Sequence, residues 1–128
     1  MTLSDGLALA AAVMLLVTGA VHSWGGEKFL LGPMFRQRGN RVLENPLARM
    51  VLRFAWHLTT LTWVILAAIL VATVVAADQI GQVARLGVGS SFLAVGLFDM
   101  VASKGKHIGW PLLSLVGILA LAAEYLVP

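Results

Sequence analysis

The stretch FAWHLTTLTWVILAAILVATVVAA, which runs from Phe54 to Ala77, contains no Asp, Glu, Lys or Arg. A helix needs about 20 predominantly apolar residues to cross the ~30 Å hydrocarbon core of a bilayer, and this stretch supplies them. Lipid offers the backbone no hydrogen-bonding partners, so the stretch must satisfy its own amides as a helix. The sequence therefore predicts a membrane-spanning helix at the middle of the chain.

Three further apolar stretches extend over Leu7–His22, Ile80–Val101 and Ile108–Val127. Only 12% of the residues are charged, about half the share in an ordinary soluble domain, so the apolar surface needs a bilayer. No stretch alternates with the period of two that a membrane β-barrel requires. We therefore expect one all-α domain over residues 1–128, an integral membrane bundle of four transmembrane helices at about 4–23, 47–77, 80–102 and 108–127.

Two connections are short and one is long. Ala77–Gln79 and Ser103–Lys106 are tight turns, which makes the helices that they join antiparallel. The long loop runs from Ser23 to about Arg49, and its apolar segment Phe29–Phe35 is interrupted by Gly32-Pro33. A segment that is apolar but too short to cross is expected to lie in the membrane interface.

Cations gather at the end of the bundle that carries the long loop. Asn45 followed by Pro46 has the pattern of a helix N-cap and first helical residue, so the second helix is expected to begin before it enters the membrane. Eight of the nine Lys and Arg residues lie at this end: Lys28, Arg36, Arg38, Arg41, Arg49, Arg53, Lys104 and Lys106. The positive-inside rule makes this end cytoplasmic and places both termini on the opposite side. The same loop accounts for the net charge of +3 without nucleic acid, either as a topology signal alone or by contact with anionic lipid headgroups.

All three histidines are expected at the cytoplasmic end. His22, His57 and His107, together with Glu27 and Asp99, form a nitrogen-and-oxygen ligand set that suits zinc, iron or copper. Two of the imidazoles could instead bind a haem iron, with Gly19 leaving room for the macrocycle one turn before His22. The chain has no cysteine, which removes thiolate chemistry.

A structural interpretation of the same residues stands beside the cofactor hypothesis. No two histidines have the i, i+3 or i, i+4 spacing of a helical metal motif, and a histidine is stable at an interface without a ligand. Arg53 and His57 lie on one stripe of the second helix, where Asp99 is the expected counter-ion of Arg53. At the opposite end, Arg85 and Glu124 are expected to pair, because a lone Arg in hydrocarbon costs about 3 kcal/mol.

The third helix is rich in small residues, including Gly87 and Ser91 four positions apart. Such surfaces let helices approach closely. They serve either packing within the chain or docking on a second copy or a larger complex.

The segments HSWGGE (His22–Glu27), RFAWHLTTLTW (Arg53–Trp63) and KHIGWPLL (Lys106–Leu113) resemble a pattern in small four-helix membrane proteins of bacteria that have no assigned activity. The resemblance extends over nearly the whole chain. It implies the four-helix fold and the bacterial inner membrane, and it assigns no catalytic residue. In that membrane, the orientation given by the positive-inside rule makes both termini periplasmic.

Three hypotheses follow for function. The leading one is an accessory or interaction subunit that acts by binding lipids and a membrane partner, either a larger complex or a second copy in a homo-oligomer. The second is a metal- or haem-binding protein that uses the histidine cluster. The third is a small oligomeric transporter in which Arg53, His57 and Asp99 line a polar route. No residue set indicates an enzymatic reaction.

Overall fold

The computed structural model describes residues 1–126, which are helical apart from short turns and contain no strand. The elements in chain order are α1 (Leu3–Gly25), the π-helix η1 (Gly26–Leu31), α2 (Gly32–Arg36), α3 (Arg41–Glu44), α4 (Pro46–Val75), the 3₁₀-helix η2 (Ala77–Gln79), α5 (Ile80–Ala102) and α6 (Gly109–Tyr125). Val127, the expected last residue of the fourth helix, lies outside the described residues.

Three helices within residues 1–126 are long and apolar enough to cross a membrane. They are Leu3–Arg36 with 34 residues, Pro46–Val75 with 30 residues and Ala77–Ala102 with 26 residues. The helix α6 is also apolar but has only 17 residues, or about 26 Å at 1.5 Å per residue. The chain is therefore a helical membrane protein with three long candidate spans and one shorter apolar helix.

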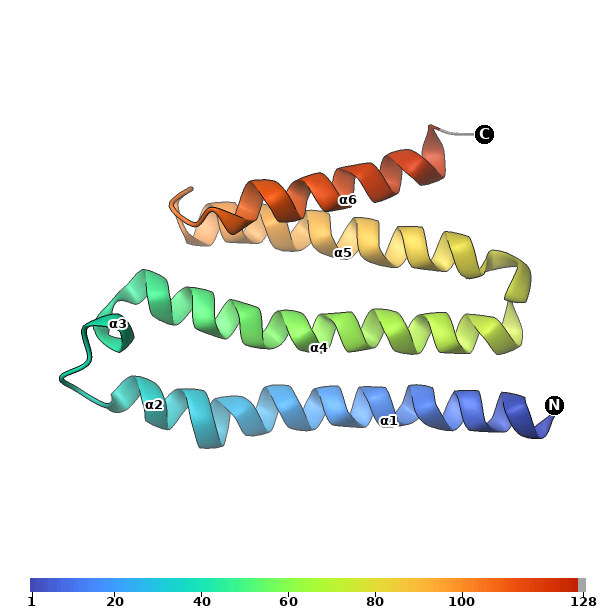
Figure 1. The fold of residues 1–128 in the computed structure, drawn as a ribbon, viewed down its shortest axis with the longest axis horizontal. Helices are drawn as coiled ribbons and strands as arrows, with labels where there is room; N and C mark the ends of the chain where they lie inside the picture. The colour runs from blue at the N-terminus through green and yellow to red at the C-terminus, as the bar shows by residue number, and fades with distance from the viewer. Residues whose placement is uncertain (127–128) are drawn as a thin grey trace.

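The helices form a single row rather than a closed bundle. Figure 1 shows α1, α4, α5 and α6 side by side in that order, with α1 and α6 at the two edges. The pairs α1–α4 and α5–α6 pack along most of their length, whereas α4 and α5 in the middle contact each other less. No helix within residues 1–126 packs across either face of this layer, so both faces are free to contact lipid or another protein.

The first helix does not end near residue 23 as expected. Its backbone continues through η1 and α2 to Arg36. The amide of Gly32 donates to the carbonyl of Glu27, five residues back, and this π-type bonding accommodates Pro33, which has no amide to donate. The expected interfacial segment is thus part of the same helix, and most of the expected long loop is helical.

Helix ends elsewhere follow the local sequence. The side chain of Asn45 accepts from the amides of Leu47 and Ala48, at 2.9 and 3.4 Å, and Pro46 is the first residue of α4. This is the predicted N-cap, and it satisfies amides that the helix itself leaves free. The predicted turn at Ala77–Gln79 is the 3₁₀-helix η2.

Glycines set the close packing of α5 on α6. A Cβ atom added at Gly96 would lie 2.6 Å from the amide nitrogen of Ser114, and one added at Gly117 would lie 2.7 Å from the Cα of Leu93. Gly89 packs in the same way against Leu121. The small residues of the third helix are therefore used, at these positions, for packing within the chain.

Candidate functional site

A polar cluster joins the end of α1 to the beginning of α4. The imidazole of His22 stacks on the indole of Trp56, with ring centres 4.2 Å apart and planes 2° from parallel. Trp56 Nε1 donates to the carbonyl oxygen of His22 at 2.9 Å, and His22 Nε2 lies 3.3 Å from the carbonyl oxygen of Trp56. The first predicted ligand is thus held between two helices by stacking and by its own hydrogen bonds.

The cluster continues through the side chains of the next residue on each helix, Ser23 and His57. Ser23 Oγ lies 2.9 Å from His57 Nδ1 and 2.8 Å from Thr60 Oγ1. On the other edge of the imidazole, His57 Nε2 lies 3.5 Å from Glu27 Oε1. The same carboxylate oxygen lies 2.8 Å from Arg53 Nε.

This cluster places a serine, a histidine and a carboxylate in sequence, with a hydrogen bond between Ser23 and His57 and an ion-pair distance between His57 and Glu27, yet its geometry is that of a helix contact. Ser23 lies inside α1, where backbone amides are engaged in helical hydrogen bonds. A nucleophilic serine needs free donors aimed at the developing oxyanion, and a helix interior offers none. The hydroxyl is also shared with Thr60, so the chain Glu27–His57–Ser23–Thr60 fastens α1 to α4.

The second polar site lies between α5 and the turn that follows it. The side chain of Asp99 is fully buried, and its Oδ2 lies 2.6 Å from His107 Nδ1. Its other oxygen, Oδ1, has no hydrogen-bond partner. The expected Arg53–Asp99 pair does not form, because Arg53 pairs with Glu27 and Asp99 pairs with His107.

The five candidate metal ligands are thereby divided between two places. Among residues 1–126 no group of three or more His, Cys, Asp or Glu side chains is arranged to hold a metal ion. Space for a haem beside Gly19 is absent as well, since a Cβ there would meet Thr60 Cγ2 at 3.1 Å. The predicted cluster of His22, Glu27, His57, Asp99 and His107 is not brought together.

At the opposite end of the row, Arg85 and Glu124 lie together as expected. Arg85 Nε is 2.7 Å from Glu124 Oε2. The carboxylate is largely buried, with 11% of its side chain exposed, so the pair connects α5 to α6 far from the histidines.

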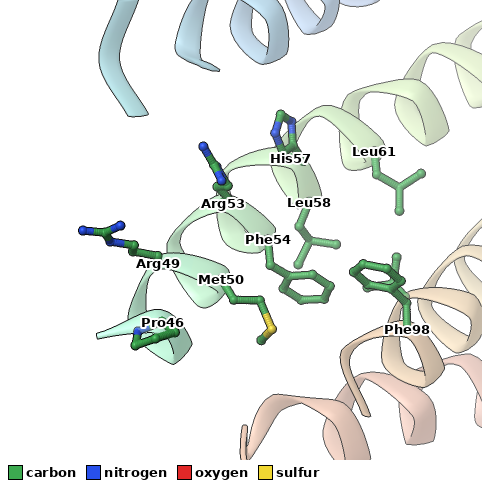
Figure 2. A pocket seen from close by; sticks show the side chains of 10 residues that line it. Pro46, Arg49, Met50, Arg53, Phe54, His57, Leu58, Leu61 and Phe98 are labelled. Atoms are coloured by element: carbon green, nitrogen blue, oxygen red, sulfur yellow. The ribbon is translucent and has the colours of Figure 1, made fainter. Parts of the chain in front are cut away.

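One face of α4 is hollowed at the histidine end. Figure 2 shows two neighbouring stripes, with Arg49, Arg53 and His57 on one and Met50, Phe54 and Leu58 on the other, facing Phe98 of α5. We call this hollow, lined also by Pro46, Leu61 and Val95, the arginine groove; its volume is about 650 Å³. The rings of Phe54 and Phe98 stack with centres 6.4 Å apart. The groove is apolar along the α5 side and cationic along the α1 side.

A second hollow continues along α4 toward its other end. It has a volume of about 460 Å³ and is bordered by Leu16 of α1 and Val83 of α5. We call it the alanine groove; its floor consists of the C-cap residue Ala76 and the α4 residues Val64, Ala67, Ala68, Val71, Ala72 and Val75. Residues 50, 54, 57, 61, 64, 68, 71 and 75 recur every three or four positions, so both grooves lie on one face of the helix.

Comparison with known proteins adds no functional assignment: no protein-family model, curated protein or solved structure matches this chain.

Sequence reasoning did not identify Ser23 and Trp56 as partners of the histidines, nor the alanines of α4 as a groove. The four-residue spacing of Ala68, Ala72 and Ala76 is visible in the sequence, and it is a signal of close helix approach. The stacking of His22 on Trp56 depends on how α1 is rotated against α4, which no local pattern specifies.

Proposed function

We propose that this chain acts by binding, as an accessory or interaction subunit that docks a transmembrane helix of a membrane complex in its alanine groove. The observation that carries the proposal is the hollow of about 460 Å³ along α4, in which Ala68 is exposed between Val64, Val71 and Val75. Within lipid, helix association is driven by close van der Waals packing at small residues rather than by the hydrophobic effect.

The shape of the groove favours a helix as its occupant. Leu16 and Val83 border the floor of small side chains on either side, so a helix laid along α4 would contact α1 and α5 as well. The small residues Gly89 and Gly96 of α5 are already covered by α6, whereas Ala68 of α4 is exposed on the floor of the hollow.

The proposal includes a location. We place the chain in the bacterial inner membrane with both termini periplasmic and the histidine end cytoplasmic. Support comes from the gathering of eight of the nine cations at the end formed by η1, α2, α3, the beginning of α4 and the α5–α6 turn, as the positive-inside rule expects.

Cysteine crosslinking tests the docking proposal, because the native chain has no cysteine and every introduced thiol is unique. Ala68→Cys, in the groove, is compared with Leu119→Cys, which is 59% exposed on the outer helix α6. In native membranes treated with a bifunctional thiol–amine or thiol–thiol reagent, the Ala68 variant is expected to give a discrete adduct, with either a partner protein or a second copy, and the Leu119 variant is not. A lone monomer at both positions contradicts the proposal.

A substitution that fills the alanine groove provides a second test of helix docking. Ala68→Trp introduces a bulky side chain at an exposed position of α4, where the chain's own fold has room for it. Association is expected to weaken about ten-fold or more, since overpacking a close contact costs about 1–3 kcal/mol. Leu119→Trp is the matched control and is expected to leave association unchanged.

A further inference from the structure

The arginine groove has the dimensions of a site for one lipid molecule. Its volume of about 650 Å³ falls within the ~300–1,000 Å³ range of small-molecule sites. From Pro46 to Leu61 it follows α4 over 16 residues, and the 15 steps between them span about 22 Å at 1.5 Å each. Half of a bilayer including its headgroup region is also about 20–22 Å thick.

The depth of each residue matches the parts of a phospholipid. Twenty residues counted back from Val75, the end of α4, reach Trp56, so the hydrocarbon boundary lies near this residue. Arg49 and Arg53 are then at the level of the headgroups, and Leu58 and Leu61 are at the level of the acyl chains. The polar and apolar parts of the groove are thus ordered as they are in a lipid.

The arginine groove carries a net positive charge. Arg53 is compensated by Glu27, with 2.8 Å between Nε and Oε1. Arg49 Nε donates to the backbone carbonyl of Leu43, and within residues 1–126 it takes part in none of the four ion pairs. Both guanidinium groups lie over the ring of Phe35, at 5.8 and 5.1 Å, which holds the two cations side by side.

We propose that the arginine groove binds one anionic phospholipid. Its phosphate lies against Arg49 with Arg53 beside it, and one acyl chain runs past Phe54 and along Leu58 and Leu61 toward the bilayer centre. A guanidinium binds phosphate oxygens with two parallel hydrogen bonds. A helix docked here would instead cover Arg49 without supplying a counter-charge, at a desolvation cost. This site lies beside the alanine groove rather than in it, so it does not rest on the proposed function.

Lipid titration of the full chain tests this proposal. In neutral-detergent micelles, phosphatidylglycerol and phosphatidylcholine with the same acyl chains are titrated separately, and bound lipid is counted by native mass spectrometry. The wild-type chain is expected to bind one phosphatidylglycerol at least five-fold more tightly than phosphatidylcholine. Arg49→Gln is expected to weaken phosphatidylglycerol about five-fold, the equivalent of about 1 kcal/mol for one cation at a membrane surface, and to leave phosphatidylcholine unchanged.

Two control variants distinguish a defined lipid-binding site from a general attraction of anions to the basic end of the protein. Arg41→Gln removes an exposed cation of the same end that does not line the groove, and it is expected to change affinity less than two-fold. Val95→Trp retains every charge but fills the groove, and it is expected to remove the single-lipid adduct. The helicity of Val95→Trp is checked by circular dichroism. If helicity is lost, the affinity of Arg49→Gln for phosphatidylglycerol is the deciding measurement.

Three results would overturn the proposal. Equal affinity for the two lipids would show that the arginines do not select a charge. An equal loss in Arg41→Gln and Arg49→Gln would mean that the basic end attracts anions without a defined site. Competition by free glycerol phosphate at the concentration at which phosphatidylglycerol binds would indicate a soluble anion, since a lipid also gains from burial of its acyl chain.

Discussion

The substitution His107→Leu is expected to destabilise the protein severely. The carboxylate of Asp99 is fully buried, and its Oδ2 has one side-chain partner, His107 Nδ1, at 2.6 Å. Its Oδ1 has none. Removal of the imidazole leaves a buried carboxylate with no compensating group, and breaking a buried pair in this way costs about 3–5 kcal/mol. The total stability of a domain is about 5–15 kcal/mol, so the loss is a large fraction of it.

The assay is equilibrium unfolding in mixed micelles, followed by fluorescence of the four tryptophans. The double variant Asp99→Leu/His107→Leu is the matched control. It removes both partners, and an apolar replacement of a buried pair is commonly neutral or stabilising. We expect the double variant to recover at least 2 kcal/mol of what His107→Leu loses, a coupling within the usual range for residues in contact. A loss below about 1 kcal/mol in His107→Leu, or no recovery in the double variant, would refute the reasoning.

Three further predictions concern helix contacts. Gly117→Val is expected to lower the free energy of unfolding by about 1–3 kcal/mol through overpacking of α6 on α5, as measured in the same micelles; an unchanged value would mean that the helices separate easily. Arg85→Gln leaves the largely buried carboxylate of Glu124 without its cation, so we expect a loss of about 1–3 kcal/mol, relieved by Glu124→Gln and contradicted if the second change adds to the first. Trp56→Phe retains the stacking on His22 but removes the 2.9 Å indole hydrogen bond; a loss of about 1 kcal/mol is expected, and a neutral result would show that this hydrogen bond does not stabilise the contact between α1 and α4.

Helix positions could be predicted well because their causes are local. The beginning of α4 is fixed by an Asn side chain and a Pro at adjacent positions, and the predicted range 47–77 differs from the observed Pro46–Val75 by only one or two residues. The range 80–102 of α5 was predicted without error. Local rules failed at Gly32-Pro33, where the π-type bonding of the preceding turn carries the helix past a residue that usually ends one.

Side-chain partners were harder to predict, because they depend on the rotation of each helix about its axis. Asp99 was assigned to Arg53 on the neighbouring helix, but it pairs with His107, only eight residues along the chain. The turn after α5 brings His107 back over the end of its own helix, where Gly109 leaves room beside the carboxylate. The ion pair between Arg85 and Glu124 was easier to predict. The two residues lie at the same level on two antiparallel helices that are joined by a short turn.

The two edges of the row differ in length. At one edge, the continuous helix Leu3–Arg36 has 34 residues, or about 51 Å, and at the other α6 has 17 residues, or about 26 Å. The stacking of His22 on Trp56 places the hydrocarbon boundary of the long helix near His22, so about 20 residues of it fit a ~30 Å core and its last 14 extend beyond. The α6 edge lacks such an extension, so the part of the protein outside the hydrocarbon lies almost entirely on the α1–α4 side of the row.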